Sequence, residues 1–224
     1  MAPFFKKVAS KIIIDVDTQA NKLPTKLEMH PEAFYKNIRR IMAWSRVHKH
    51  NVVSTTLVKE EINYANDLQD IVPESYTGHR KLRYSTLANN ICYSTSCNTD
   101  LPNDLLKKYQ QVIFEKMTID PFQHPKADRL FTNIKCDEIY LIGTSAETSI
   151  LYTGLGLLLR NKNVFVVIDA ICGEAPKSTA LEIRKIIAKG GKSITTEELI
   201  GKKSKLIGTP SAMRVKDIQF KAHI

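Results

Sequence analysis

Apolar and polar positions follow two different periods along this chain, and together they predict an α/β fold. Short apolar, often β-branched runs bounded by polar residues are typical of buried parallel strands. Such runs occupy residues 11–16, 51–56, 111–115, 138–143, 163–169 and 192–195. Between them, helical patterns cover residues 31–48, 126–134, 147–160 and 178–189. This alternation predicts a three-layer αβα fold around a mostly parallel, Rossmann-like sheet of about six strands.

One long stretch has no clear period. Residues 66–103 are rich in Ser, Thr and Asn, and only residues 81–87 alternate in a way that favours a hairpin. We interpret residues 66–110 as an inserted loop or hairpin within a single domain of residues 1–200. A basic tail, residues 201–224, follows this domain.

The charge of the chain is concentrated in that tail. The formal net charge is +10 over 224 residues, and the tail contains six Lys or Arg against Asp217 alone. A basic tail can bind nucleic acid, an acidic partner or another subunit, or it can be a solvated segment. No nucleic-acid-binding motif accompanies the charge, so we do not expect a nucleic acid partner.

The sequence also gives expectations about the location of the protein and about metal binding by its cysteines. No run of 18 uncharged apolar residues is present and the first ten residues do not resemble a secretory signal, so we expect a cytoplasmic protein that does not enter a membrane. Reduced thiols are then expected at Cys92, Cys97, Cys136 and Cys172. Cys92 and Cys97 are five residues apart, which is not the usual spacing of a zinc site.

Candidate chemistry lies where the predicted strands end. In an open parallel sheet, ligands bind beyond the carboxyl ends of the strands, at the point where strand order reverses. Asp17 follows the first predicted strand and Lys116 follows the strand at residues 111–115. The segment 143–149 follows another strand and runs into a helix that carries Ser149 near its start. A carboxylate, an ammonium and a hydroxyl are therefore expected to converge at one edge of the sheet.

Four segments around these residues resemble the isochorismatase-like cysteine hydrolases, a family that includes nicotinamidases. Val16-Asp17-Thr18-Gln19 resembles the Asp-Met-Gln motif that opens the family, and residues 112–116 look like the segment that delivers its lysine. Asp120-Pro121-Phe122 is similar to its Ser-Ala-Phe stretch. Residues 143–150 are similar to its Gly-Val-Ala-Thr-Asp/Glu-x-Cys-Val turn, and residues 166–170 match its strand ending in Asp-Ala. The order and spacing agree over residues 11–199, nearly the whole chain.

The resemblance implies a mechanism and a set of site residues. Asp17 would take and return a proton, Lys116 would hold the charges, and residue 149 would attack an amide-type carbonyl. A cis peptide between Thr144 and Ser145 would turn the amides of Ser145 and Ser149 toward the oxyanion. Phe122 and Glu147 would line the pocket. The resemblance also implies a small amide-like ligand, a homo-oligomer and no cofactor.

The sequence departs from the family at the nucleophile. Position 149 is serine, whose hydroxyl ionises far less readily than a thiol with a pKa of about 8.5. Two interpretations stay open: a hydrolase of C–N bonds with altered or weakened chemistry, or a catalytically inactive member that binds a small molecule or acts as a scaffold. Asp17 and Lys116 could also persist only as a structural ion pair.

A second departure concerns metal ligands. Nicotinamidase-like members carry an Asp-x-His element after the second strand, where this chain has residues 54–59 with no ligand set. His48 and His50 precede that strand, at its opposite end. We therefore expect no catalytic zinc or iron.

Overall fold

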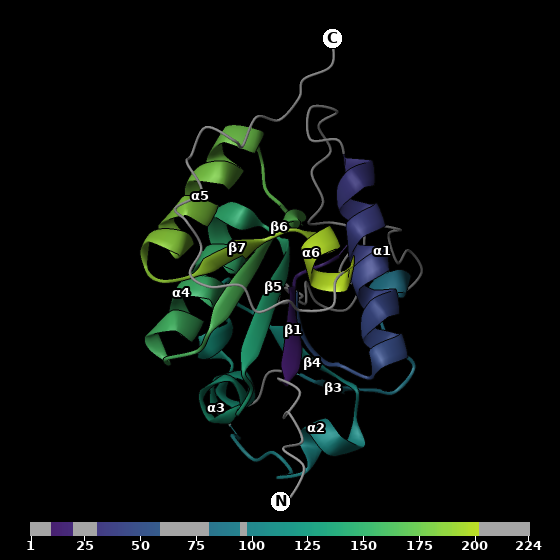
Figure 1. Cartoon of the computed structure of the whole chain (residues 1–224). Coiled ribbons are helices and arrows are strands. Elements are labelled where there is room, and N and C mark those ends of the chain that lie inside the picture. The colour runs from purple at the N-terminus through teal and green to yellow at the C-terminus, as the bar shows by residue number, and fades with distance from the viewer. Residues whose placement is uncertain (1–9, 20–30, 59–80, 95–97, 202–224) are drawn as a thin grey trace, which may run out of the picture.

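The chain folds into three layers, with helices on both faces of one central sheet (Figure 1). A computed structural model describes residues 10–19, 31–58, 81–94 and 98–201. The strands are β1 (Lys11–Val16), β2 (Asn51–Leu57), β3 (Asn90–Tyr93), β4 (Gln111–Lys116), β5 (Glu138–Thr144), β6 (Val164–Cys172) and β7 (Lys192–Ile194). The helices are α1 (Pro31–His48), α2 (Leu105–Lys108), α3 (Pro125–Asn133), α4 (Leu151–Leu159), α5 (Pro176–Ala188) and α6 (Thr196–Gly201), with short turns η4 (Arg83–Ser85), η5 (Pro121–Gln123) and η6 (Ala146–Ile150).

All seven strands of the sheet are parallel, in the order β3-β4-β2-β1-β5-β6-β7. The αβα architecture is the predicted one, with one strand more than the six expected. The additional strand is β3, which lies within the segment interpreted as an insertion and pairs with β4 at the edge of the sheet.

The hairpin expected over residues 81–87 is replaced by other structure. Lys81 forms one antiparallel bridge with Gln19, and the chain then makes the η4 turn. The apolar alternation of Leu82 and Tyr84 does not correspond to burial on one face, because both are half-buried while Ser85 and Leu87 are buried, with Leu87 in the core beneath α1.

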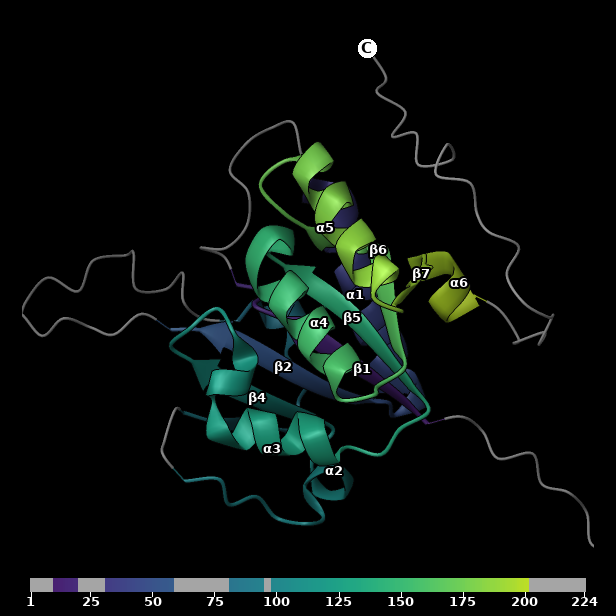
Figure 2. The ribbon, with the colours of Figure 1, turned by 90° about the vertical axis from the view of Figure 1, so that its left-hand side faces the viewer.

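Two apolar cores lie on the two faces of the sheet. Successive strand residues point to opposite faces, so Ile12, Ile14 and Val16 of β1 pack in the core shared with α3, α4 and α5, whereas Ile13 packs in the core beneath α1 and α6. Figures 1 and 2 show α4 and α5 on one side of the sheet and α1 on the other. Among the described residues, no helix combines the length and apolar character needed to cross a bilayer.

Gly143 lets β5 approach the end of β1 closely. Its φ is +120°, and a Cβ at this position would lie 2.0 Å from the carbonyl oxygen of Val16. Only glycine can occupy this backbone position without displacing β1. The turn that follows β5 is consequently brought next to Asp17, at the carboxyl edge of the sheet.

Candidate active site

A left-handed backbone conformation at Asp17, just after β1, changes the direction of its side chain. In regular alternation its side chain would lie on the same face as that of Asp15, but its φ is +46°. Its amide donates to the carbonyl of Thr55 at 3.1 Å, and Thr144 Oγ1 donates to its carbonyl at 2.9 Å. Strand β2 and the end of β5 therefore hold this conformation, and the carboxylate reaches Lys116.

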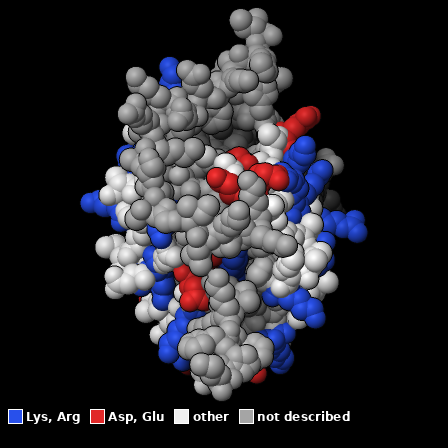
Figure 3. Space-filling view, in the orientation of Figure 1, with Lys and Arg blue, Asp and Glu red and all other residues white. Residues whose placement is uncertain are grey.

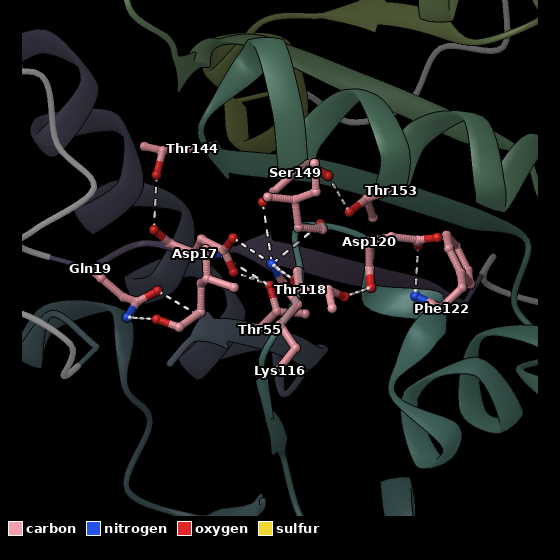
Figure 4. Close-up of polar contacts among 12 residues, drawn as sticks. Asp17, Gln19, Thr55, Lys116, Thr118, Asp120, Phe122, Thr144, Ser149 and Thr153 are labelled. Carbon is pink, nitrogen blue, oxygen red and sulfur yellow. Dashed lines mark hydrogen bonds and ion pairs between the residues drawn. The ribbon is translucent and has the colours of Figure 1, made fainter. Parts of the chain in front are cut away.

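Lys116 lies at the centre of the constellation (Figure 4). Residues two apart in a strand share a face, so the side chain of Lys116 lies on the same face of β4 as Val112 and Phe114. This is the face covered by α3 and α4. Lys116 Nζ donates to Asp17 Oδ2 at 2.7 Å and to Ser149 Oγ at 3.2 Å. Main-chain carbonyl groups of the following loop also accept from this ammonium, at 3.1 and 3.4 Å. The ion pair is 1% exposed on both sides, so its two charges depend on each other for solvation.

Ser149 is buried in the η6 turn that follows β5. The Ser149 hydroxyl oxygen accepts the hydrogen bond from Lys116, while Thr153 Oγ1 donates to the Ser149 carbonyl at 2.6 Å. Within the described part of the chain, no carboxylate or imidazole is hydrogen-bonded to Ser149 Oγ. The serine therefore contacts the ammonium directly, and the same ammonium contacts Asp17.

The turn between β5 and Ser149 is tied to the loop after β6 by Glu147. The Thr144–Ser145 peptide bond in this turn is cis. Glu147 Oε2 accepts from Ser145 Oγ at 3.0 Å, and Oε1 accepts from Ser178 Oγ at 2.6 Å and from the Glu174 amide at 3.0 Å. Burial acts to raise the pKa of Glu147, but these hydrogen bonds outweigh it and lower the pKa below its ordinary value. Glu147 is thus an ionised clamp on the turn.

The ring of Phe122 packs on α4 beyond the position of Ser149. A Cβ on Gly156 would lie 1.9 Å from its Cε2, so glycine makes room for the ring. Phe131 meets the ring edge-on at 5.5 Å, and the guanidinium of Arg160 covers it at 3.9 Å. The structure brings Asp17, Lys116 and Ser149 together, whereas it places Phe122 in the packing between η5 and α4.

Thr55 is a site residue that the sequence analysis missed. Its Oγ1 donates to Asp17 Oδ1 at 2.7 Å, so both carboxylate oxygens of Asp17 are engaged. One signal for it was present: Ser54-Thr55-Thr56 is a run of hydroxyl residues inside a central strand, between the apolar Val52-Val53 and Leu57. Buried hydroxyl groups in such a strand need hydrogen-bond partners.

A second buried ion pair lies on the other face of β1. Lys81 Nζ is 2.5 Å from Asp15 Oδ2, with side chains 6% and 0% exposed. Thr18 Oγ1 donates to Asp15 Oδ1, and the Leu82 amide donates to the Thr18 carbonyl at 3.0 Å. The segment after residue 80 is thereby fixed to the residues beside Asp17.

The described residues at the ends of β1 and β2 do not form a set of zinc ligands. The side chains at the end of β2 are the hydroxyl of Thr56 and the apolar Leu57, which are not zinc ligands. Asp17 is already paired with Lys116. In the parts of the chain that the structure describes, no group of three or more His, Cys, Asp and Glu side chains could hold a metal ion.

Known structures share this fold at low sequence identity. A ribonuclease, MAR1 from Caenorhabditis elegans, matches at 16% identity with a TM-score of 0.58, over 86% of this chain and 80% of that chain. The YcaC gene product of Escherichia coli, an octameric hydrolase of unknown specificity, matches at 13% identity and 0.61, over 88% and 83%. A zinc-containing pyrazinamidase from Pyrococcus horikoshii matches at 15% identity and 0.56, over 83% and 99%.

Comparison of sequences gives the family. No curated protein matches the chain. The family model of the isochorismatase domain matches residues 11–198, which is well over half of the sequence and includes Asp17, Lys116 and Ser149. The chain therefore belongs to the isochorismatase family.

Proposed function

We propose that this chain is a hydrolase of amide-type C–N bonds whose chemistry is weakened by serine at the nucleophile position. The observation that carries the proposal is the bridge formed by Lys116, whose Nζ lies 2.7 Å from Asp17 Oδ2 and 3.2 Å from Ser149 Oγ. A buried carboxylate, ammonium and hydroxyl in contact provide a proton acceptor, a proton relay and a nucleophile. Structural neighbours that are hydrolases support this class of reaction.

The reaction would proceed in two steps through an ester. Lys116 gives a proton to Asp17 as it takes the proton of Ser149 Oγ, and the serine oxygen attacks the carbonyl carbon of the amide. The oxyanion is stabilised by the amides of Ser145 and Ser149. The C–N bond then breaks, and the leaving nitrogen takes the proton back from Asp17 through Lys116. Water hydrolyses the ester, which releases the acid and restores the serine.

The same geometry explains why the activity would be weak. A serine nucleophile normally contacts a strong base directly, but Ser149 Oγ contacts the ammonium of Lys116. Both oxygens of Asp17 already accept hydrogen bonds, from Thr55 and from Lys116. This arrangement also favours the second candidate function, a protein that binds a small polar ligand at the carboxyl edge and performs no chemistry.

Replacing Ser149 with cysteine distinguishes these two functions. The ammonium of Lys116 would stabilise a thiolate at this position and lower its pKa into the range of about 3.5–7.5. Ser149→Cys should react with iodoacetamide at pH 7 and should hydrolyse simple amides such as nicotinamide faster than the unchanged chain does. Ser193→Cys, at an exposed position on β7, is the matched control for an ordinary thiol.

Each outcome supports one of these two functions or contradicts the site. A reactive thiol in Ser149→Cys with new turnover supports the weakened hydrolase, and Ser149→Ala should then abolish the residual activity of the unchanged chain. A reactive thiol with no turnover on a broad panel of amides supports the binding protein. A thiol no faster than the one in Ser193→Cys contradicts the assignment of Asp17, Lys116 and Ser149 as one site.

The active form is proposed to be a homo-oligomer. Helix α4 is apolar on most of its surface, yet Tyr152 is 47% exposed and Leu159 is 82% exposed. An octameric neighbour supports this proposal. Light scattering on the purified chain should give a mass above 25.4 kDa, and Tyr152→Glu should shift it toward that of the monomer.

A further inference from the structure

The edge of the sheet opposite the candidate site is lined by lysines. All parallel strands begin at this amino edge, and each strand from β4 to β7 in the sheet order starts at or just after a lysine. The row consists of Lys107 and Lys108 before β4, Lys49 before β2, Lys11 in β1, Lys135 before β5, Lys162 before β6, and Lys189 and Lys192 at β7. Six neighbouring strands span about 24 Å, so lysines from loops far apart in sequence line one edge of the sheet, where Lys11 is also 3.9 Å from the carboxylate of Glu138.

The row has an excess of positive charge that helix ends alone do not explain. Lysines are favourable near helix C-termini, which accounts for residues such as Lys49 and Lys189. Lys11 and Lys192 are strand residues, however, and lie at the same edge. The acidic residues at this edge are Asp104, Asp137 and Glu138. Figure 3 shows Lys and Arg side chains on both sides of the lower end of the molecule, where this edge lies.

Aromatic rings are interleaved with these cations on the α1 face. The Trp44 ring is 4.3 Å from that of His50 and 5.6 Å from that of His48. The ammonium of Lys11 is 5.7 Å from the Trp44 ring and 5.5 Å from the Tyr140 ring. Farther along, Tyr140 stacks on Phe165 at 5.2 Å, and Lys192 lies 5.0 Å from the Phe165 ring.

A polar hollow lies at the same edge, between the starts of β5 and β6. It has a volume of about 370 Å³, and its polar lining consists of Ser10, Lys135, Asp137, Asn161, Lys162 and Asn163. Two ammonium groups, two amides and a hydroxyl therefore surround a concave surface beside the basic row, together with the Asp137 carboxylate, which accepts hydrogen bonds from Ser10. Such groups can hydrogen-bond to phosphate oxygens and to the edges of unpaired bases.

We propose that the amino edge is a binding surface for single-stranded nucleic acid. A basic track that follows the backbone, together with aromatic side chains beside it, is the arrangement that binds single strands without a sequence preference. The lysine row supplies the track, and Trp44, His48 and His50 supply rings at its side. The surface was not evident in the sequence because six separate connections contribute to it, and none of them is a motif.

A matched pair of triple variants of the full chain tests the proposal. The edge variant is Lys49→Glu, Lys135→Glu and Lys189→Glu. The control variant is Lys36→Glu, Arg83→Glu and Lys177→Glu, which are exposed like the first set, lie away from the amino edge and change the net charge equally. The ligand is a fluorescein-labelled oligouridine of about 12 nucleotides, and binding is measured by anisotropy at several salt concentrations.

The edge variant should bind at least tenfold more weakly than the unchanged chain. The slope of log K against log salt should also become shallower by about 2. Each lost phosphate contact removes about 0.7 from this slope, and the edge variant loses three lysines. The control variant should stay within twofold. Trp44 is the single tryptophan of the chain, so its emission should change when the oligouridine binds, and His48→Ala should weaken binding by about fivefold.

Several results would overturn the proposal. Equal loss of affinity in both triple variants would mean that only net charge attracts the oligonucleotide. Binding that survives in the edge variant and disappears on removal of residues 202–224 would assign it to the tail. Val47 and Leu159 are exposed apolar residues at helix ends on this edge. Binding to vesicles rich in phosphatidylserine, without binding to oligouridine, would therefore make the partner a lipid surface.

Discussion

Thr55 Oγ1 donates a 2.7 Å hydrogen bond to Asp17 Oδ1, on the oxygen that Lys116 does not contact. Strand β2 therefore fixes the direction of the carboxylate from one side while β4 neutralises it from the other. Thr55 is fully buried, so no water is available to replace its hydroxyl.

Thr55→Val should destabilise the protein by about 1.5–3 kcal/mol, the usual contribution of a hydrogen bond to a charged group. Thr55→Ser keeps the hydroxyl and should cost only about 1 kcal/mol for the lost methyl group. Urea unfolding at pH 7 measures both variants. Thr55→Val keeps the methyl group, so a Thr55→Val variant as stable as the unchanged chain would show that packing, and not the bond to Asp17, is what Thr55 contributes.

Removing the ammonium of Lys116 should be more damaging than removing both charges. Lys116→Met leaves the buried Asp17 carboxylate unpaired and should cost about 3–5 kcal/mol. Asp17→Asn combined with Lys116→Met removes that charge and should recover a large part of the loss. A double-mutant cycle with Asp17→Asn gives the coupling free energy. Additive effects of the two substitutions would contradict a direct interaction.

The described cysteines should react slowly with alkylating reagents at neutral pH. Burial raises the pKa of Cys136 and Cys172 to about 11, and Cys92, although part of it reaches the surface, has its pKa raised to about 11 by desolvation and by the neighbouring Glu115. At pH 8 roughly one such thiol in a thousand is a thiolate, and this fraction rises about tenfold per pH unit up to pH 10.

Iodoacetamide labelling read by mass spectrometry at pH 7, 8, 9 and 10 checks this expectation. Cys97 lies outside the described residues, so the measurement uses the Cys97→Ser variant. Fast labelling of any one of the three thiols at pH 7 would mean that its surroundings stabilise the thiolate. When Ser149→Cys is added to this variant, the introduced thiol should be modified first.

Two glycines with positive φ should respond differently to alanine. Gly190 has a φ of +107°, and a Cβ at this position would have no atom within 4 Å, so Gly190→Ala should cost only the backbone strain of about 1–3 kcal/mol. Gly143→Ala adds a contact of 2.0 Å with the carbonyl oxygen of Val16 and should cost more than about 4 kcal/mol. Thermal unfolding compares them. Similar midpoints would mean that β5 can move away from β1.

Removal of residues 202–224 should leave the domain folded. Helix α6 ends at Gly201, and its Leu199 is already buried beneath α1. The midpoint of thermal unfolding should change by less than about 2 °C. A clearly lower midpoint would show that the tail packs on the domain or on a partner subunit.

The regular elements were predictable because their patterns are local. The helix over residues 31–48 and the strand over residues 11–16 have the expected bounds, since each is a periodic run between polar breaks. The positions of Asp17 and Lys116 at the carboxyl edge were predictable because both lie at the ends of such strands. Edge strand β3 was missed because only four residues form it and none of them is fully buried.

The polar contacts within the site were not predictable in the same way. Thr55 touches Asp17 only because β2 pairs with β1, and Lys81 reaches Asp15 across a long connection. The direction of each side chain depends on the register of two strands and on a left-handed φ at Asp17. These quantities are fixed by packing of the whole sheet and leave no periodic trace in the sequence.

The buried ion pairs of Asp15, in β1, and of Asp17, just after it, also constrain how the protein folds during synthesis. Asp15 and Asp17 lie near the N-terminus, but their partners, Lys81 and Lys116, are synthesised much later; Lys116 follows Asp17 by 99 residues. Until those segments leave the ribosome, β1 exposes two carboxylates that cannot be buried without great cost. The strand at the centre of the sheet therefore completes its burial late, and a nascent chain that stops before Lys116 should not hold β1 in its native place.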